Sequence, residues 1–161
     1  MKLGLIADTH DNIPNIRKAI KIFNETGIRL IAHAGDFIAP FSAKEFKAFK
    51  GKIIAVFGNC DGEKKGLKEA FKGIGEIYEE GFSFRAGRRH IFLTHVPDNL
   101  ESDSMIKEYD LLIFGHTHKA EVKKIGGSVI VNPGEAGGWL YGKATIAIAD
   151  LESLSVKIIS L

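Results

Sequence analysis

The chain has 161 residues, with 22 basic side chains, 20 acidic side chains and a single cysteine. This length fits one domain of ordinary size, and folding buries roughly 70% of the surface of such a chain. A lone cysteine excludes an internal disulfide and favours a reducing, cytoplasmic setting. The charges nearly cancel and form no basic-aromatic stripe, so no long nucleic acid is expected as a partner. The apolar run before Asp8 is too short for a secretory leader or a membrane span, so no membrane partner is expected either.

The first half of the chain alternates between apolar, β-suited runs and segments of helical periodicity. Strands are predicted at residues 2–7, 29–34 and 52–57. A first helix is predicted from Pro14 to just before Gly27, which is suited to ending it. Further helices are predicted at residues 41–50, with Phe41, Phe46 and Phe49 available for packing, and at residues 64–72. This order, βαβαβα, predicts a parallel sheet with crossover helices.

From Glu76 onward the β-suited runs are short and turns are frequent, as in antiparallel hairpins. Strands are expected at residues 77–80, 82–85, 90–94, 111–114, 120–125, 128–131, 144–149 and 155–159. One more helix is expected at residues 100–108. Residues 1–161 are therefore predicted to form a single α/β domain, in which a parallel or mixed sheet is followed by an antiparallel meander sheet.

Residues capable of binding a metal follow five of the predicted strands. They are Asp8 and His10, Asp36, Asn59, His95, and His116 with His118. Ligands of open α/β sheets bind outside the carboxyl ends of the strands, so these side chains are expected to share one crevice. Carboxylate, imidazole and amide donors suit Mn²⁺ or Ni²⁺, and also Fe, Zn²⁺ or Mg²⁺. The sequence has no set of cysteines that would form a structural zinc site. Seven donors exceed the needs of one ion and predict two, bridged by a carboxylate and a water, which is the clamp used for in-line attack at phosphorus.

These residues resemble the calcineurin-like metallophosphoesterases, in particular their small single-domain archaeal and bacterial phosphodiesterases. The resemblance spans essentially the whole chain and rests on five short blocks in the family's order. The blocks are D-x-H at Asp8, G-D at Gly35, G-N-x-D at Gly58, the lone His95, and G-H-x-H at Gly115. The resemblance implies a four-layer αββα sandwich.

The resemblance also implies how the ligands are divided between two ions. One ion would be held by Asp8, His10, Asp36 and His118. The other would be held by Asp36, Asn59, His95 and His116, with Asp36 bridging. The implied reaction is hydrolysis of a small phosphodiester by a bridging hydroxide, in which Asp8, Asp36, Asn59 and His116 act through the metals and no protein nucleophile is needed.

One position departs from the broad family pattern. Cys60 stands where relatives carry a histidine that is thought to assist the leaving group. A thiol with a pKa of about 8.5 is a poor hydrogen-bond donor, so substrates with good leaving groups are expected. Two alternatives to the diesterase stay open: a phosphomonoesterase or nucleotidase on the same site, and a non-catalytic metal-binding scaffold such as the retromer subunit with a similar fold. Self-association as a homodimer through apolar side chains of the meander is a further hypothesis.

The remaining polar residues receive simpler interpretations. His33 and His90 lie within strands and are interpreted as structural, and Cys60 as a small packing residue, because no neighbouring base would make it a nucleophile. Either Asp11 or Asn12 is expected to orient a bound phosphate or a metal ligand.

The segment from Asn132 to Gly134 looks like an N-P-G element of the small branch and is expected to line the cleft. For Trp139 and Tyr141 the core, a subunit contact and a cleft wall all stay open.

Overall fold

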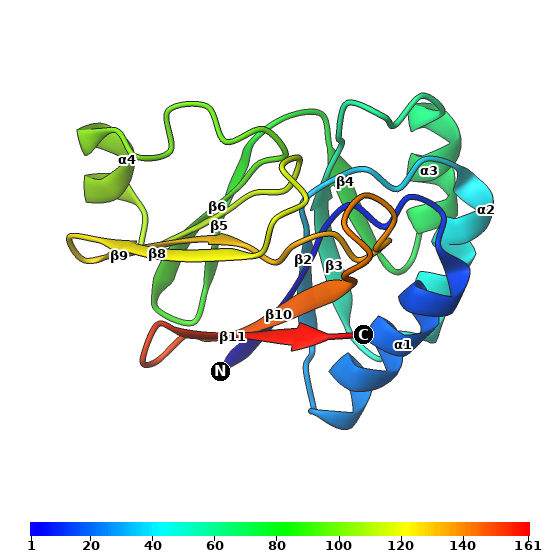
Figure 1. Cartoon of the computed structure of the whole chain (residues 1–161), viewed down its shortest axis with the longest axis horizontal. Coiled ribbons are helices and arrows are strands. Elements are labelled where there is room, and N and C mark those ends of the chain that lie inside the picture. Colours follow the sequence, from blue (N-terminus) through cyan, green and yellow to red (C-terminus); the bar gives the residue numbers. More distant parts are fainter.

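The computed structural model describes residues 1–161 and contains two β-sheets that pack face to face (Figure 1). The first sheet has the strand order β11-β10-β1-β2-β3-β4. Its strands are β1 Lys2–Ile6, β2 Leu30–His33, β3 Lys52–Val56, β4 Gly75–Tyr78, β10 Thr145–Asp150 and β11 Ser155–Ser160. Neighbours from β1 to β4 are parallel, whereas β10 is antiparallel to both β1 and β11.

The second sheet has the strand order β5-β6-β7-β9-β8. Its strands are β5 Phe82–Ala86, β6 Arg89–Leu93, β7 Leu111–Ile113, β8 Glu121–Ile125 and β9 Ser128–Asn132. The three central strands β6, β7 and β9 are parallel, and the two outer strands are antiparallel to their neighbours.

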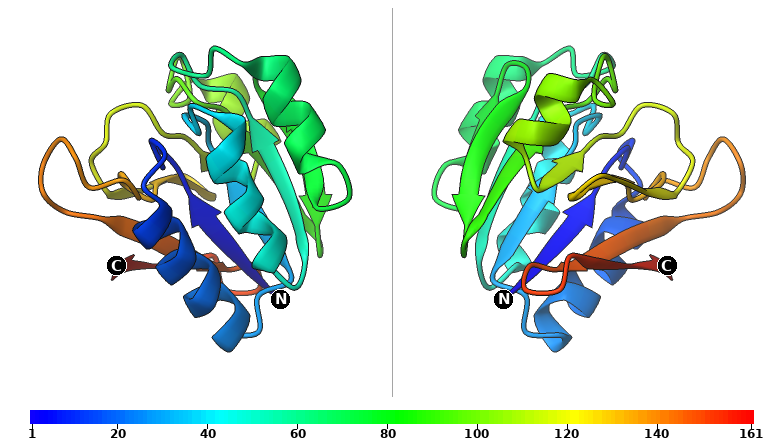
Figure 2. Two further views of the ribbon diagram at one scale, coloured as in Figure 1. Left: turned by 90° about the vertical axis from the view of Figure 1, so that its right-hand side faces the viewer. Right: turned by 90° about the vertical axis from the view of Figure 1, so that its left-hand side faces the viewer.

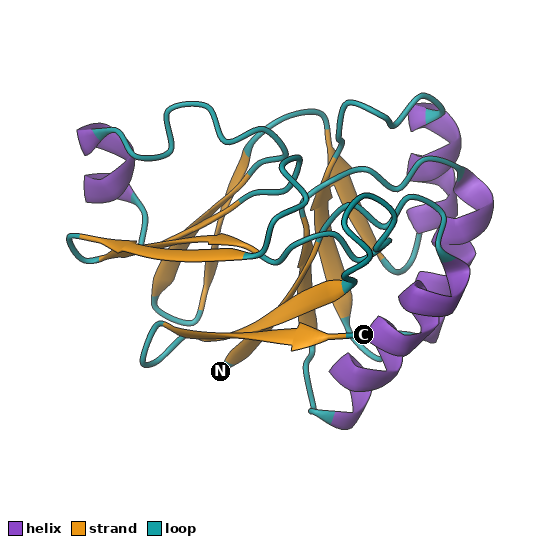
Figure 3. Ribbon diagram, viewed as in Figure 1, coloured by secondary structure: helices purple, strands orange, loops and turns teal.

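Helices cover the outer face of each sheet (Figure 3). Three helices and a 3₁₀ turn lie on the first sheet, and one short helix lies on the second. They are α1 Ile13–Glu25, α2 Pro40–Ala43, the 3₁₀ turn η1 Lys44–Ala48, α3 Lys64–Phe71 and α4 Asp103–Glu108. The predicted four-layer αββα sandwich is confirmed, with helical layers of unequal size. No helix is both long and apolar enough to cross a membrane.

Three apolar clusters hold these layers together. The largest joins the amphipathic face of α1 and the phenylalanines Phe37, Phe46 and Phe71 to the first sheet. A second fills the space between the two sheets, and a small third one lies under α4. Full burial of each aromatic ring stabilises the fold by roughly 1.5–3 kcal/mol. The cluster around Phe37 therefore stabilises the loop that begins at Gly35.

Several sequence-based expectations differ from the structure in detail. Strand β4 pairs with β3, and β10 and β11 return to the first sheet, so the division of strands between sheets was wrong. The second sheet is mixed and is not antiparallel throughout, because β6, β7 and β9 are joined by long connections that allow parallel pairing. The helix expected at residues 41–50 is split into α2 and η1, and Phe41 is 52% exposed although Phe46 and Phe49 are buried.

Candidate metal centre

Loops at the carboxyl ends of five strands meet at one end of the two sheets (Figure 2). Strands β1, β2 and β3 contribute from the first sheet, and β6 and β7 contribute from the second. Each of these loops carries one or more of the predicted metal ligands. The structure brings all seven predicted ligands together in two sets of donor atoms that share one residue.

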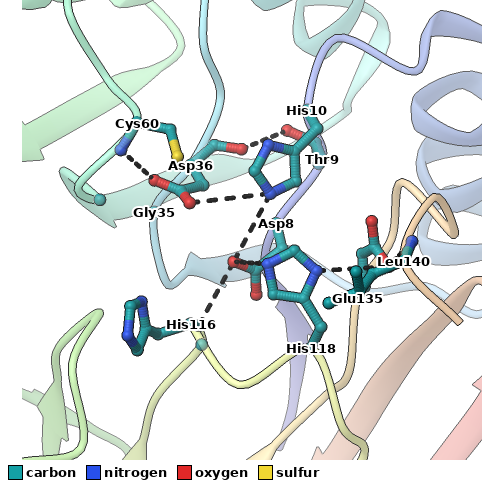
Figure 4. A network of polar contacts seen from close by, with 12 residues as sticks. Asp8, Thr9, His10, Gly35, Asp36, Cys60, His116, His118, Glu135 and Leu140 are labelled. Carbon is teal, nitrogen blue, oxygen red and sulfur yellow. Dashed lines mark hydrogen bonds and ion pairs between the residues drawn. The ribbon is translucent and has the colours of Figure 1, made fainter.

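The first donor group consists of Asp8, His10, Asp36 and His118, whose donor atoms all lie within 4.8 Å of one another. Nε2 of His118 lies 3.6 Å from Oδ1 of Asp8, and Nε2 of His10 lies 3.7 Å from Oδ2 of Asp36 (Figure 4). Ligands bound at 2.0–2.2 Å around one ion lie roughly 3.0–3.5 Å apart. The observed spacing is therefore close to that of a metal site.

The second donor group consists of Asp36, Asn59, His95 and His116. Oδ1 of Asn59 lies 2.8 Å from Nε2 of His95 and 2.9 Å from Nδ1 of His116. Nε2 of His95 also lies 3.5 Å from Oδ2 of Asp36. Asn59 and His116 are exposed, and the cleft beside this group, with a volume of about 420 Å³, is lined by Asn59 and His95 among others.

The protonation of His95 leaves a ring nitrogen free for a cation. Nδ1 of His95 lies 2.7 Å from the carbonyl oxygen of Ala34, which only accepts hydrogen bonds, so Nδ1 carries the proton. Burial lowers the pKa of His95, which favours the neutral ring. The lone pair of Nε2 then faces the amide oxygen of Asn59. A cation bound by both atoms would satisfy them.

Asp36 is shared by the two donor groups. Its Oδ1 accepts a hydrogen bond from the backbone N–H of Cys60 at 2.8 Å, which orients the carboxylate. The other oxygen, Oδ2, lies 3.7 Å from His10 and 3.5 Å from His95. Gly58 makes room for this arrangement, because a Cβ atom there would lie 2.0 Å from Oδ1 of Asp36.

The backbone of the centre is held in an uncommon conformation. Five of the seven predicted ligands have positive φ angles, which non-glycine residues rarely adopt. They are Asp8 at 51°, His10 at 40°, Asp36 at 60°, His116 at 66° and His118 at 60°. Such conformations are sparsely populated and cluster at functional sites, where the surrounding structure enforces them.

Asp61 enforces this conformation around Asp36. Its two carboxylate oxygens accept four backbone hydrogen bonds, from Asp36, Phe37, Ile38 and Gly58, at 2.7–3.1 Å. Burial raises the pKa of Asp61, although the backbone donors offset part of that shift. The sequence placed Asp61 in the G-N-x-D block, but its role in holding two ligand loops together was not predicted.

Two further supporting residues were missed. Glu135 is buried, and its Oε2 lies 3.3 Å from Nδ1 of His118. Asn132 donates from Nδ2 to the carbonyl oxygen of Gly115 and to Oγ1 of Thr117, which fixes the loop that carries His116 and His118. The expectation that the segment from Asn132 to Gly134 lines the cleft was wrong, because all three residues are buried. The N-P-G element pointed to Asn132 without its role, and for Glu135 the only signal was an acidic residue beside glycines.

Electrostatics indicate that the centre lacks positive charge. The pKa of Asp8 is raised to about 8, mainly by burial and secondly by the charge of the neighbouring Asp36 carboxylate. Oδ2 of Asp8 and Nε2 of His10 are buried without a hydrogen-bond partner. Unpartnered buried polar atoms are costly unless a ligand satisfies them. The donor types, their spacing and these unpaired atoms together fit a divalent cation.

The interpretation of His33 and His90 as structural residues agrees with their surroundings. Nδ1 of His33 accepts a hydrogen bond from the backbone of Gly35, and its buried ring stacks on Phe37. Burial lowers the pKa of His33 well below the ordinary value, so the ring is neutral. His90 lies away from both donor groups, with Nδ1 3.0 Å from the carbonyl oxygen of Glu108.

Cys60 differs from expectation, and the structure shows which groups Asp11 and Asn12 contact. Cys60 is exposed, so its interpretation as a packing residue was wrong. Partial loss of hydration of the thiol, followed by the charge of the nearby Asp36 carboxylate, raises the pKa of Cys60 to about 11, which disfavours a nucleophilic thiolate. Asp11 and Asn12 bind backbone groups, the N–H of Ala39 and the carbonyl of Gly137, and Asn12 also caps α1. They fix loops around the centre.

The fold and this centre agree with what comparison with known proteins shows. Residues 1–154 match the family described as the calcineurin-like phosphoesterase superfamily domain. The chain therefore belongs to the calcineurin-like phosphoesterases, and it is a hydrolase.

Individual relatives agree with this placement. The chain is 42% identical over 156 residues to Phosphodiesterase MJ0936 of Methanocaldococcus jannaschii, with 94% of each chain covered. It is 27% identical over 151 residues to Phosphodiesterase YfcE of Escherichia coli strain K12, with 83% of this chain and 78% of that protein covered.

Solved structures extend the comparison to the whole fold. A structure described as a novel archaeal phosphodiesterase superposes with a TM-score of 0.93 and 40% identity over 100% of both chains. Vps29 of Entamoeba histolytica complexed with Zn²⁺ superposes with a TM-score of 0.72 and 21% identity over 100% of this chain and 98% of that one. At that identity the likeness to Vps29 shows the fold alone.

Proposed function

We propose that this chain is a metal-dependent phosphodiesterase whose centre takes two divalent ions. The observation that carries the proposal is the position of Asp36, whose Oδ2 lies between His10 of the first donor group and His95 of the second. One ion would be held by Asp8, His10, Asp36 and His118, and the other by Asp36, Asn59, His95 and His116. Two ions in these positions would supply a bridging hydroxide as nucleophile and neutralise charge on the phosphoryl oxygens.

The residues of the chain would prepare this centre for catalysis. Asp61 and the Cys60 N–H hold Asp36 in place, and the Ala34 carbonyl fixes the tautomer of His95. The Thr9 hydroxyl donates to the carbonyl oxygen of Asp36, and the Cys60 thiol has a raised pKa, so neither group is activated as a nucleophile. These features support hydrolysis without a covalent enzyme intermediate.

Preference for diesters over monoesters is supported by two observations. The relatives that are 42% and 27% identical to this chain are named phosphodiesterases. Cys60 also offers no imidazole to assist a poor leaving group, which favours substrates with good leaving groups.

The nitrogen and oxygen donors favour Mn²⁺ or Ni²⁺. We further propose that residues 1–161 act as one cytoplasmic domain, supported by the absence of any disulfide-forming cysteine pair.

The proposal is tested with chelator-stripped protein, to which Mn²⁺, Ni²⁺, Mg²⁺ and Zn²⁺ are added back separately. Hydrolysis of an aryl phosphodiester and of the matching monoester is measured. The expected result is metal-dependent cleavage that prefers the diester, is lost in His10→Ala and His116→Ala, and persists in His90→Ala, since His90 lies outside both donor groups. Dominant monoester cleavage would instead identify a phosphomonoesterase, and metal binding without cleavage of either ester would identify a scaffold.

A further inference from the structure

The connection between β9 and β10 exposes three consecutive large hydrophobic side chains. Trp139 is 66% exposed, Leu140 is 62% exposed and Tyr141 is 50% exposed. Figure 2 shows this connection beside the loops that follow β1 and β7, which carry ligands of the first donor group. Contiguous exposed hydrophobic groups commonly mark a binding surface.

This connection is fastened directly to the metal-binding loop after β1. The indole N–H of Trp139 donates to the carbonyl oxygen of His10 at 3.2 Å, and the N–H of Gly137 donates to the carbonyl oxygen of Asp8 at 2.9 Å. Asn12 donates from Nδ2 to the carbonyl oxygen of Gly137 at 2.7 Å. The indole is therefore held next to the peptide that carries a metal-binding side chain.

A buried carboxylate joins the same connection to the loop after β7, which carries His118. Oε1 of Glu135 accepts the backbone N–H of Trp139, and Oε2 accepts that of Leu140. Oε2 of Glu135 also lies 3.3 Å from Nδ1 of His118 (Figure 4). The position of the aromatic segment and the orientation of His118 thus depend on one side chain.

A cation completes this surface. Lys119 directly follows His118, is exposed, and places Nζ 5.6 Å from the centroid of the Tyr141 ring. We propose that Trp139, Tyr141 and Lys119 form a substrate subsite for a phosphodiester arm that carries a planar aromatic ring, such as a nucleobase. The inference rests on the proposed function and assigns the substrate class to phosphodiesters with one such arm.

The arm bound here is the one that stays on phosphorus. Cys60 lies beside the second donor group, because it contacts Asn59 and its backbone N–H donates to Asp36. Trp139 and Glu135 contact the first donor group, and Figure 4 shows Cys60 and Leu140 on different sides of the centre. A leaving group on the Cys60 side places the retained arm toward the aromatic surface.

A second copy of the chain is a poorer occupant of this surface. A stable protein interface buries about 800 Å² and some 20–30 residues on each side, far more than three adjacent side chains provide. The surface is also hydrogen-bonded to the loop after β1, and through Glu135 it is linked to His118. These contacts fix an aromatic ring relative to a bound phosphate.

Two diesters with the same leaving group test the inference by kinetics. Methyl 4-nitrophenyl phosphate and thymidine 5′-(4-nitrophenyl phosphate) both release 4-nitrophenol and differ only in the retained arm. We expect the nucleoside diester to have the higher kcat/KM and Trp139→Ala to reduce that preference about tenfold. Trp139→Phe, which keeps an aromatic ring, should retain most of the preference, and Phe41→Ala, which removes another exposed aromatic ring, should leave it unchanged.

Fluorescence gives a readout that does not need turnover. Trp139 is the only tryptophan of the chain, so its emission reports on the proposed subsite alone. Thymidine 5′-monophosphate should change the emission of the Mn²⁺-loaded protein at concentrations where methyl phosphate does not. This result would stand even if the protein hydrolysed neither diester, so failure of the proposed function is distinguishable.

The inference is overturned if Trp139→Ala leaves the preference between the two diesters unchanged, or if the nucleotide leaves the emission unchanged. It is also overturned if Trp139→Ala changes the molar mass measured by analytical ultracentrifugation and leaves the substrate preference unchanged, because the surface would then serve self-association.

Discussion

Replacement of Asp61 by asparagine removes half of the support for the Asp36 loop while keeping the size of the side chain. Oδ2 of Asp61 accepts N–H groups of Asp36 and Gly58, and Oδ1 accepts those of Phe37 and Ile38. An asparagine offers one accepting oxygen, so its NH₂ group must face two N–H donors. The loop contains positive φ angles at Asp36 and Ile38, which the lost bonds help to hold.

The size of the effect follows from the number of bonds lost. At about 1 kcal/mol net for each bond, Asp61→Asn should lower the free energy of unfolding by about 2 kcal/mol and Asp61→Ala by about 4 kcal/mol. A displaced Asp36 should also weaken metal binding by about 10–100-fold, as is typical when a residue that orients metal ligands is lost.

Urea unfolding of the metal-free protein and calorimetric titration with Mn²⁺ measure the two effects separately. Asp103→Asn is the matched control, because Asp103 is 99% exposed on α4 and its loss should cost no more than about 0.5 kcal/mol. If Asp61→Asn unfolds and binds Mn²⁺ like Asp103→Asn, the role assigned to Asp61 is refuted.

Three further predictions concern other residues of the centre. Because the pKa of Asp8 is raised to about 8, the folded metal-free protein keeps a proton that the unfolded chain loses near pH 4. Asp8 should therefore reduce stability as pH rises from about 4 to 8, by up to about 1.4 kcal/mol per pH unit, and urea unfolding of Asp8→Asn should lack this slope. An equal slope in both proteins would contradict the assigned shift. Cys60→Ser should keep diesterase activity within about twofold, and iodoacetamide should alkylate Cys60 slowly at pH 7.5, because its pKa is about 11; rapid alkylation with loss of activity would argue for a reactive thiolate. Asn132→Ala frees the loop of His116 and His118 and should weaken Mn²⁺ binding, measured by calorimetry, by about tenfold. The control Ser104→Ala on α4 should not weaken it. Equal affinity in both variants would show that the loop holds its position without Asn132.

The sequence predicted the end of the sheet at which the centre lies. Residues such as Asp8 and Asn59 follow directly after buried strands, and the geometry of parallel strands brings their loops together. The partner of each strand was less predictable. The apolar residues of β4 and β10 predict strands, but they carry no information on which strand supplies the neighbouring hydrogen bonds.

The residues that support the ligands were the least predictable part of the centre. Glu135 contacts His118, which lies 17 residues away along the chain, and Asn132 contacts Gly115, which is also 17 residues away. Neither residue belongs to a periodic pattern. The exposure of Cys60 was also missed, since it depends on how the loop after β3 turns around Asp36. Such features follow from packing between loops, which local sequence patterns do not record.

Electron paramagnetic resonance of the Mn²⁺-loaded protein, together with its bound-metal content, tests whether Asp36 joins two metal ions. We expect two Mn²⁺ ions per chain with the spectrum of an exchange-coupled pair, and loss of that coupling in Asp36→Asn. One ion per chain with the six-line spectrum of isolated Mn²⁺, or an unchanged coupled spectrum in Asp36→Asn, would contradict this expectation.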